Sequence, residues 1–489
     1  MSDPLFCRKC PAGKTFPSRS TTLPSELLEF PASPASLGFL PMKAFPARRG
    51  IVLPRTVTVF AFLVSLLLLP AAPASDRVNW PTRSGPTLDS LVAPADAQGL
   101  PLTWSEETEQ NIAWKLQLEE FGHSTPIIGH NRIWLTAATK DGRQQFIYCI
   151  DQQTGKVLHH RLLFENPDPE PLKNEVNTYA SPSCALEDDA VYVHFGTYGT
   201  ARLNPVTFEL VWQRRDINAR HFRGPGSSPI LWKNLLILTF DGVDAQFVTA
   251  VDKATGRTVW RTDRTTDYGD LDENGKPKLD GDIRKAYGTP GIVEVNGKAQ
   301  IVSIGSRAAF AYDAETGKEL WTIRHDDFNA SSPPLFHQNH AILNTGSRSS
   351  NLLSVRLEES TRGDVTTSHV VWNRDKGNSD LSAPVLVGQR IYSTANNGVV
   401  TSVNVETGEE VWKGRIEGTF TASPIAAGDR IYFCNEEGTT YVVQAADEFR
   451  VLAQNKLSEG QRASPSAADG MLFLRTFKNL YAIKQGAGK

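Results

Sequence analysis

The sequence predicts an all-β protein: an eight-bladed β-propeller of four-stranded antiparallel blades, closed by an N-terminal strand that completes the last blade. Three observations support this prediction. A polar turn followed by Trp recurs along the chain, and a short segment ending in Pro recurs eight times out of phase with it. The incomplete units at the two ends also complement each other. Repeats of about 40 to 60 residues are typical of propellers and not of helical solenoids.

The first repeat is seen in full at residues 252–260, which read DKATGRTVW. An Asp or Asn side chain can accept a hydrogen bond from the backbone two residues on, and Gly suits a position with positive φ. We expect the Trp on the outer strand, wedged against the next blade, where its burial stabilises each unit by roughly a few kcal/mol. In one copy His159 replaces the Trp. The tryptophans assigned this structural docking role are Trp114, Trp212, Trp260, Trp321, Trp372 and Trp412.

The second repeat marks the start of the inner strands, because proline is tolerated at the first residue of a strand but not at its centre. In the third unit, β-branched and aromatic runs bounded by turn residues predict strands at 228–232, 235–240 and 246–251, with a fourth after the turn. No sustained helical spacing is found. The repeated prolines, 40 to 61 residues apart, are Pro126, Pro182, Pro229, Pro290, Pro333, Pro384, Pro424 and Pro465.

The two ends of the repeat region predict closure of the ring. The last unit, from Ser464, has residues for three strands and lacks a Trp strand, whereas residues 111–118 (NIAWKLQL) form a Trp strand with no unit before it. Pairing these two segments would complete the eighth blade and leave no sheet edge open. The propeller is thus expected over residues 110–485, with a lead-in segment at 75–109 and a tail at 486–489.

Residues 42–74 have the pattern of a signal peptide. Three arginines precede an apolar run at 57–69, and small residues follow it, with cleavage expected after Ala74. The run is shorter than the roughly twenty residues that span a bilayer, so we expect no transmembrane span after cleavage. Residues 1–41 represent either a start assigned too early or a disordered extension. The protein is therefore expected in the periplasm or outside the cell.

The charge and the cysteine content of the sequence exclude some classes of function. Lys and Arg number 51 against 54 Asp and Glu, a net charge of −3, which excludes the basic surplus of a nucleic-acid-binding protein. The three cysteines after the signal, Cys149, Cys184 and Cys434, cannot form a disulfide framework and are expected to be buried. We expect a monomer that binds a protein partner in the cell envelope or a small ligand.

The form A-x-D-x-x-T-G-x-x-x-W, at residues 250–260 and 311–321, resembles the tryptophan-docking repeat of pyrroloquinoline quinone (PQQ)-type propellers. That family includes quinoprotein alcohol dehydrogenases and the propeller subunit of the bacterial outer-membrane β-barrel assembly machinery. The resemblance covers residues 110–485 and implies the architecture, since enzymes and scaffolds share this fold.

The dehydrogenase branch of this family implies specific site residues. Its alcohol dehydrogenases stack the quinone between a Trp and a disulfide of adjacent cysteines, hold Ca²⁺ with carboxylates and use an Asp as base. This chain has no adjacent cysteine pair, although the soluble sugar-dehydrogenase branch also lacks that disulfide. We expect no cofactor, with PQQ and calcium as the alternative.

Residues just before each repeated proline should converge on one mouth of the central channel, where loops on a rigid scaffold form binding sites. The alternative is that they only solvate the mouth and cap strand ends. The ligand-binding candidates are His123, Tyr179, His221, Arg223, Lys285, Tyr287 and Arg462.

An acidic insertion in the third interval is a candidate metal site. Asp270, Asp272 and Asn274 match the first half of a calcium loop, with oxygen ligands at alternate positions. Gly281 stands where a bidentate Glu should close the loop, so a solvated acidic turn is the alternative that we favour.

Two functions remain open. The first is an exported, non-catalytic propeller that serves as a protein- or ligand-binding scaffold. The alternative is a PQQ- and calcium-dependent quinoprotein dehydrogenase that oxidises an alcohol or a sugar. The mature chain has no nucleophile elbow, phosphate-binding glycine loop or zinc-ligand spacing, which favours the scaffold.

Overall fold

The structure is a computed structural model that describes residues 77–173, 176–347 and 350–488. The chain divides into two compact units, Met1–Leu68 and Leu69–Lys489, and all described residues belong to the second. The expected extension at 1–41 and the signal peptide at 42–74 lie outside the described residues.

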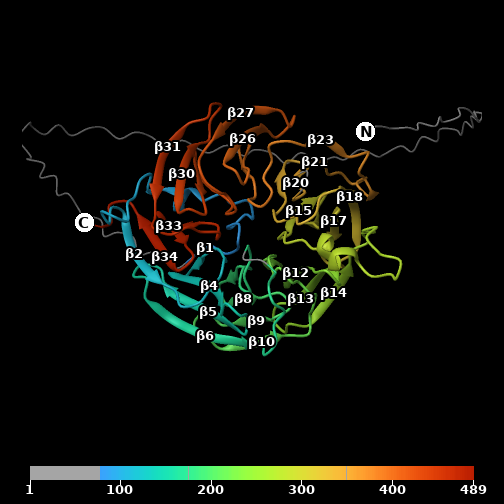
Figure 1. The fold of residues 1–489 in the computed structure, drawn as a ribbon, viewed down its shortest axis with the longest axis horizontal. Coiled ribbons are helices and arrows are strands. Elements are labelled where there is room, and N and C mark those ends of the chain that lie inside the picture. Colours follow the sequence, from blue (N-terminus) through green and yellow to red (C-terminus); the bar gives the residue numbers. More distant parts are fainter. Residues whose placement is uncertain (1–76, 174–175, 348–349, 489) are drawn as a thin grey trace, which may run out of the picture. The chain divides into compact units, whose positions relative to one another are not determined.

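Eight sheets are arranged in a ring, with their inner strands facing a common axis that we call the channel, which confirms the predicted eight-bladed β-propeller (Figure 1). Blades 1 to 4 contain β3 (Ile127–Gly129), β4 (Arg132–Ala138), β5 (Gln144–Asp151) and β6 (Val157–Glu165); β7 (Ala185–Glu187), β8 (Ala190–His194), β9 (Thr200–Leu203) and β10 (Leu210–Arg214); β11 (Ile230–Trp232), β12 (Leu235–Asp241), β13 (Gln246–Asp252) and β14 (Thr258–Asp263); and β15 (Gly291–Val295), β16 (Lys298–Ile304), β17 (Ala308–Asp313) and β18 (Glu319–Arg324).

Blades 5 to 8 repeat the same order from the inner to the outer strand. They contain β19 (Leu335–His337), β20 (His340–Asn344), β21 (Leu352–Arg356) and β23 (Val370–Arg374); β24 (Val385–Val387), β25 (Arg390–Thr394), β26 (Val399–Asn404) and β27 (Glu410–Arg415); β28 (Ile425–Ala427), β29 (Arg430–Cys434), β30 (Thr439–Gln444) and β31 (Val451–Lys456); and β32 (Ser466–Ala468), β33 (Met471–Arg475), β34 (Asn479–Lys484) and β2 (Ile112–Gln117).

The ring closes as the sequence predicts. Strand β2, from the N-terminal side of the propeller, pairs antiparallel with β34, and Trp114 lies opposite Ala482 in the register. The last blade thus gains its outer strand from a segment more than 350 residues earlier in the chain. Because β34 is covered, this blade presents no unpaired edge at the closure.

The indole groups of the docking tryptophans join one blade to the next by hydrogen bonds. The Nε1–H of Trp114, Trp212, Trp260, Trp372 and Trp412 each donates to a backbone carbonyl oxygen of the following blade, at 2.8 to 3.3 Å. At the first four of these seams a Cβ on the turn glycine would lie only 2.5 to 2.7 Å from an indole carbon. This close approach, together with positive φ, requires Gly at the turn. Trp321 differs, because its Nε1–H donates to Gln300 Oε1 within its own blade.

A chain of hydroxyl groups joins the inner strands near the repeated prolines. The backbone N–H of Thr125 donates to Ser183 Oγ, that of Ser183 to Ser228 Oγ, and that of Ser228 to Thr289 Oγ1, at 2.9 to 3.0 Å. The same contact runs from Ala383 to Ser423 at 3.0 Å. Three of these acceptors, Ser228, Thr289 and Ser423, stand directly before a repeated proline, and each satisfies a buried backbone donor of the preceding blade.

The lead-in segment enters the channel, which the sequence analysis did not anticipate. Its strand β1 (Val78–Trp80) pairs with β3 as a fifth strand of the first blade, and the Trp80 side chain is 1% exposed. Further along, the N–H of Leu186 on β7 donates to Pro81 O, and Ala426 on β28 bonds the backbone of residues 90 and 92. Residues 78–92 of the lead-in thus occupy the channel beside the inner strands of the first, second and seventh blades.

Helical structure is minor. The described residues contain α1 (Pro94–Ala97), which bonds the last blade at Asp469 and Gly470, and the 3₁₀ segment η1 (Lys278–Arg284) in the acidic insertion. A short strand, β22 (Gly363–Asp364), adds to β18 in parallel. Neither helix is long or apolar enough to cross a membrane.

Candidate functional site

One mouth of the channel contains a cavity of about 430 Å³, which we call the cup. Its walls come from the segments that connect one blade to the next, since each precedes the proline that starts an inner strand. Every one of the eight crossings contributes at least one residue, and the lead-in contributes Arg83. The lining residues used below are Arg83, His123, Arg223, Asp282, Tyr287, Phe328, Leu381, Thr421 and Arg462.

The structure brings four of the seven sequence-predicted residues together around the cup: His123, Arg223, Tyr287 and Arg462. Burial, reinforced by the nearby cations Arg475 and Arg462, lowers the pKa of His123 to about 3. Its imidazole is therefore neutral at physiological pH.

The other three predicted residues lie beside or behind the cup. Tyr179 lines an adjacent cavity of about 700 Å³ that shares His123 and Arg462 with the cup, and its hydroxyl donates to Glu170 O at 2.9 Å. His221 packs against the Tyr287 ring, with centroids 4.9 Å apart, and burial lowers its pKa to about 4. Lys285 is fully buried.

Asp282 organises the charged wall of the cup. Its carboxylate accepts from Arg223 Nε at 2.9 Å and pairs with Lys285 Nζ at 2.6 Å. Burial alone would raise the pKa of Asp282, but these two cations hold it below its ordinary value. Burial lowers the pKa of Lys285 to about 8, and its ammonium also donates to Asn329 Oδ1 at 3.0 Å. The Asp282 carboxylate thus forms ion pairs with both Arg223 and Lys285.

Sequence reasoning missed Arg83, which stands at the tip of the lead-in where the chain turns back. Its Nη2 donates to Ser423 Oγ at 3.1 Å, and burial lowers its pKa to about 10, so the guanidinium stays charged at neutral pH. Within the described part of the chain no carboxylate pairs with it. No local pattern could have revealed this residue, because its contact joins positions 340 residues apart.

The acidic insertion uses its carboxylates within the protein. Asp270 forms an ion pair with Arg284 at 2.6 Å, and Asp272 Oδ1 accepts from the backbone N–H of Asn274 at 2.8 Å and of Lys276 at 2.9 Å. These are the contacts of a hydrogen-bonded turn. The calcium hypothesis for Asp270, Asp272 and Asn274 stays a prediction, and no proposal is built on it.

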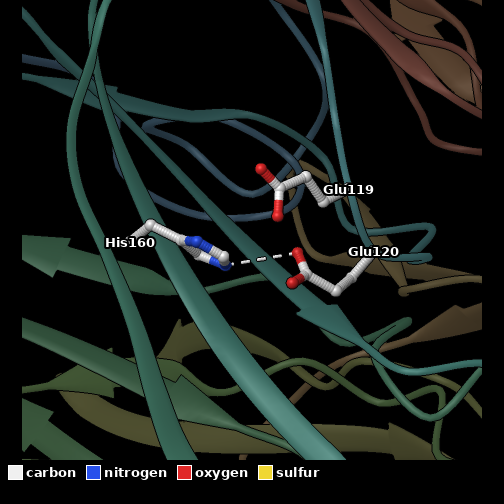
Figure 2. A group of neighbouring side chains, drawn as sticks. All are labelled: Glu119, Glu120 and His160. Carbon is white, nitrogen blue, oxygen red and sulfur yellow. Dashed lines mark ion pairs between the residues drawn. The ribbon is translucent and has the colours of Figure 1, made fainter.

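A second cluster, absent from the sequence predictions, lies at the seam between the last blade and the first. Figure 2 shows Glu119 and Glu120, which follow β2, facing His160 on β6. His160 Nε2 lies 3.2 Å from Glu120 Oε2, and the Tyr148 hydroxyl donates to the same oxygen. The His160 ring also stacks on Tyr148, with centroids 4.2 Å apart. The cluster joins the closing strand to blade 1 by ordinary polar contacts.

The three described cysteines are buried and unpaired by disulfides. Burial raises the pKa of each thiol, so none is activated as a thiolate. None of the three lines the cup.

The family model of outer membrane protein assembly factor BamB matches residues 244–489, slightly more than half of the chain. The chain belongs to this family. Comparison with curated proteins gives no match.

Solved structures support the same BamB-family fold. BamB from Moraxella catarrhalis has a TM-score of 0.51 at 12% identity, over 76% of this chain and 99% of its own. The quinohemoprotein alcohol dehydrogenase from Comamonas testosteroni has a TM-score of 0.62 at 13% identity, over 86% and 82%. A europium-containing methanol dehydrogenase has 0.61 at 11% identity, over 84% and 90%. The resemblance to PQQ-type propellers is confirmed, and at these identities the structures show the fold alone.

Proposed function

We propose that this member of the BamB family is an exported, non-catalytic propeller that binds a ligand or a partner protein in the cup. The observation that carries the proposal is the convergence of all eight blade crossings on one cavity. Its volume of about 430 Å³ lies within the range of small-ligand sites. A closed ring of blades also holds these side chains rigidly, as a binding site requires.

The titration behaviour of the cup supports binding over acid–base catalysis. A general acid or base works best with a pKa near the operating pH. The pKa of His123 falls to about 3, that of Asp282 is lowered by its cationic partners, and that of Tyr287 is raised by burial. Each of these three shifts moves away from neutrality. Lys285, whose pKa falls to about 8, is fully buried behind the cup and paired with Asp282.

The alternative, a PQQ- and calcium-dependent dehydrogenase, fits the lining residues poorly. Among the described lining residues there is no Trp to stack on a quinone, and the one carboxylate, Asp282, is already shared by Arg223 and Lys285. Calcium prefers several oxygen ligands, carboxylates among them. The cup therefore lacks the donor set that the resemblance to alcohol dehydrogenases implies.

Export is part of the proposal and has two supports. The residues before Ser75 have the order of a signal peptide, and the family is described as an outer membrane protein assembly factor. We propose the periplasm as the location, with a partner in the cell envelope.

Two measurements on the full-length protein test the proposal. Titration with PQQ and Ca²⁺ should give no dye-linked oxidation of alcohols or sugars. A photo-crosslinking residue at Leu381, on the cup wall, should capture a partner or ligand in intact cells. The same residue at Val371, which is 46% exposed on β23 and outside the cup lining, is the control. Turnover with the quinone, or crosslinking at Val371 alone, would contradict the proposal.

A further inference from the structure

The floor of the cup holds a positive charge that no carboxylate among the described residues neutralises. The lead-in carries Arg83 through the channel to the hydroxyl chain, where its only described side-chain partner is the neutral Ser423. A charge removed from water costs free energy unless it is paired, and an unfolded chain would leave Arg83 in water. Burial of the Arg83 guanidinium at this position therefore lowers the free energy of unfolding.

A second polar group at the cup also lacks a partner. The Oγ1 of Thr421 is buried without a hydrogen bond in the described structure. Thr421 precedes Ser423 by two residues on the same blade crossing, and both Thr421 and Arg83 line the cup. Buried hydroxyl groups in native proteins usually have a partner, so the Thr421 hydroxyl can donate to a water molecule or a ligand atom in the cavity.

The charges around the cup have a positive balance. Glu436 pairs with Arg462 at 2.9 Å, and Asp282 is shared as described above. Among the described lining residues one carboxylate, Asp282, thus faces three cations, which are Arg83, Arg223 and Arg462. Because His123 is neutral, it adds nothing to this balance. A cleft of one charge sign with low-dielectric walls concentrates ligands of the opposite sign.

We propose that the cup binds a small organic anion whose carboxylate is held by Arg83 and Thr421. A guanidinium matches the planar geometry of a carboxylate with two parallel N–H donors, and a hydroxyl supplies a further donor. Tyr287, Phe328 and Leu381 on the surrounding wall provide apolar surface for the body of the ligand. The inference rests on the proposed function and names the chemical class that the cup recognises.

The test uses thermal melting and calorimetry of the full-length protein with matched anionic and neutral probes. Benzoate and hexanoate should bind and raise the melting temperature, whereas benzamide and hexanamide should not. Phenyl phosphate is included as a third kind of probe, because its affinity relative to benzoate distinguishes a phosphate site from a carboxylate site. Increasing salt should weaken benzoate binding, because the attraction is partly electrostatic.

Variants assign the effect to the named residues. Arg83→Gln should weaken benzoate binding about tenfold or more, the loss expected for one charge-assisted interaction. Thr421→Val should weaken it less, and Arg324→Gln, a half-exposed arginine on β18, should leave it unchanged. Without ligand, Arg83→Gln should melt at the same or a higher temperature than the parent, because an unpaired charge is removed. A purely structural arginine would give a lower melting temperature.

Three outcomes would overturn the inference: equal affinity for benzoate and benzamide, benzoate affinity unchanged in Arg83→Gln, or no binding of any anion in the panel. A preference for phenyl phosphate over benzoate would replace the carboxylate by a phosphate. If the anions fail while crosslinking at Leu381 persists, the binding function stands and only its chemical class is wrong. Dye-linked turnover would instead remove the binding function itself.

Discussion

His159 and Phe208 exchange the usual roles of the two docking residues at the seam between blades 1 and 2. At four other seams a Trp packs on a turn glycine, but here His159 stands at the Trp position and Phe208 at the glycine position. The two rings stack with centroids 4.4 Å apart, and Phe208 keeps the positive φ, 60°, of the glycine that it replaces. The large residue has moved to the turn, so the seam is filled from the opposite side.

This exchange predicts strong coupling between the two positions. His159→Trp alone should lower the free energy of unfolding by about 1 to 3 kcal/mol, because the larger ring overpacks against Phe208. Phe208→Gly alone should also destabilise, since it leaves a cavity beside His159. The double variant restores the Trp–Gly pair and should recover at least about 1 kcal/mol relative to additivity. Urea unfolding of all four proteins measures this, and additive effects would contradict the interpretation.

At the scale of elements, the acidic insertion forms ion pairs with residues in the two preceding blade crossings. Asp280 accepts from Arg220 Nη1 at 2.9 Å and Nη2 at 2.8 Å, and from Lys173 Nζ at 3.4 Å. These contacts hold residues 279–281, all of which have positive φ. Left-handed backbone is unfavourable for residues other than Gly, so the ion pair supports a conformation that the local sequence disfavours.

The Asp280 contacts predict that the insertion loosens in acid. Hydrogen bonds from Arg220 lower the pKa of Asp280 to about 2. A carboxylate with a lowered pKa stabilises the fold above its unfolded pKa, near 4, and the contribution is lost as the pH falls through about 2. The protection factors of the amides of residues 278–284, which correct the exchange rate for its intrinsic dependence on pH, should therefore fall over this interval in the parent.

The matched variant for this test is Asp280→Asn. It should exchange faster than the parent above pH 4 and converge with it near pH 2, whereas Glu107→Gln, an exposed site outside the insertion, should follow the parent throughout. A constant difference between Asp280→Asn and the parent at every pH would show that protonation of Asp280 has no part in the effect.

At the scale of the whole molecule, stability depends on β2, which joins the two ends of the ring. It covers β34, packs Trp114 against the turn glycine of blade 1, and leads into Glu120, which contacts Tyr148 and His160. Both the first and the last blade therefore rely on one strand.

Replacing β2 (Ile112–Gln117) by a Gly/Ser segment of equal length should lower the free energy of unfolding by about 3 kcal/mol, because the partly buried Trp114 and its packing on the last and first blades are lost. Amide protection should fall in β34 and β5 together. The same replacement of β27 (Glu410–Arg415) should lower protection first in blades 6 and 7. A β2 variant with the denaturation midpoint of the parent would contradict the importance of closure.

Much of the fold could be predicted because the residues that determine its turns lie close together in the sequence. The side chain of Asp252 bonds backbone and hydroxyl groups within three residues, and Gly256 follows in the same turn. Such contacts are visible in a single stretch of sequence. Closure could be inferred as well, because the eighth blade lacks the strand that residues 111–118 supply.

The candidate site could be predicted only in part. Position before a repeated proline was enough to place His123, Arg223, Tyr287 and Arg462 around one cavity. It did not determine where each side chain points, so Lys285 lies buried behind the cup and Tyr179 faces the neighbouring cavity. Side-chain direction follows the local backbone and packing, and the spacing of prolines carries neither.

The sequence by itself determined the number of blades, their turns and the strand that closes the ring, because these depend on residues close together in the chain or on a repeat that can be counted. The tertiary structure alone decided that the lead-in fills the channel and brings Arg83 to the floor of the cup. The physical reason is that this placement depends on packing between Trp80 and the inner strands of distant blades. Such packing depends on the shape and charge of residues far apart in the sequence, so no repeat or local motif predicts it.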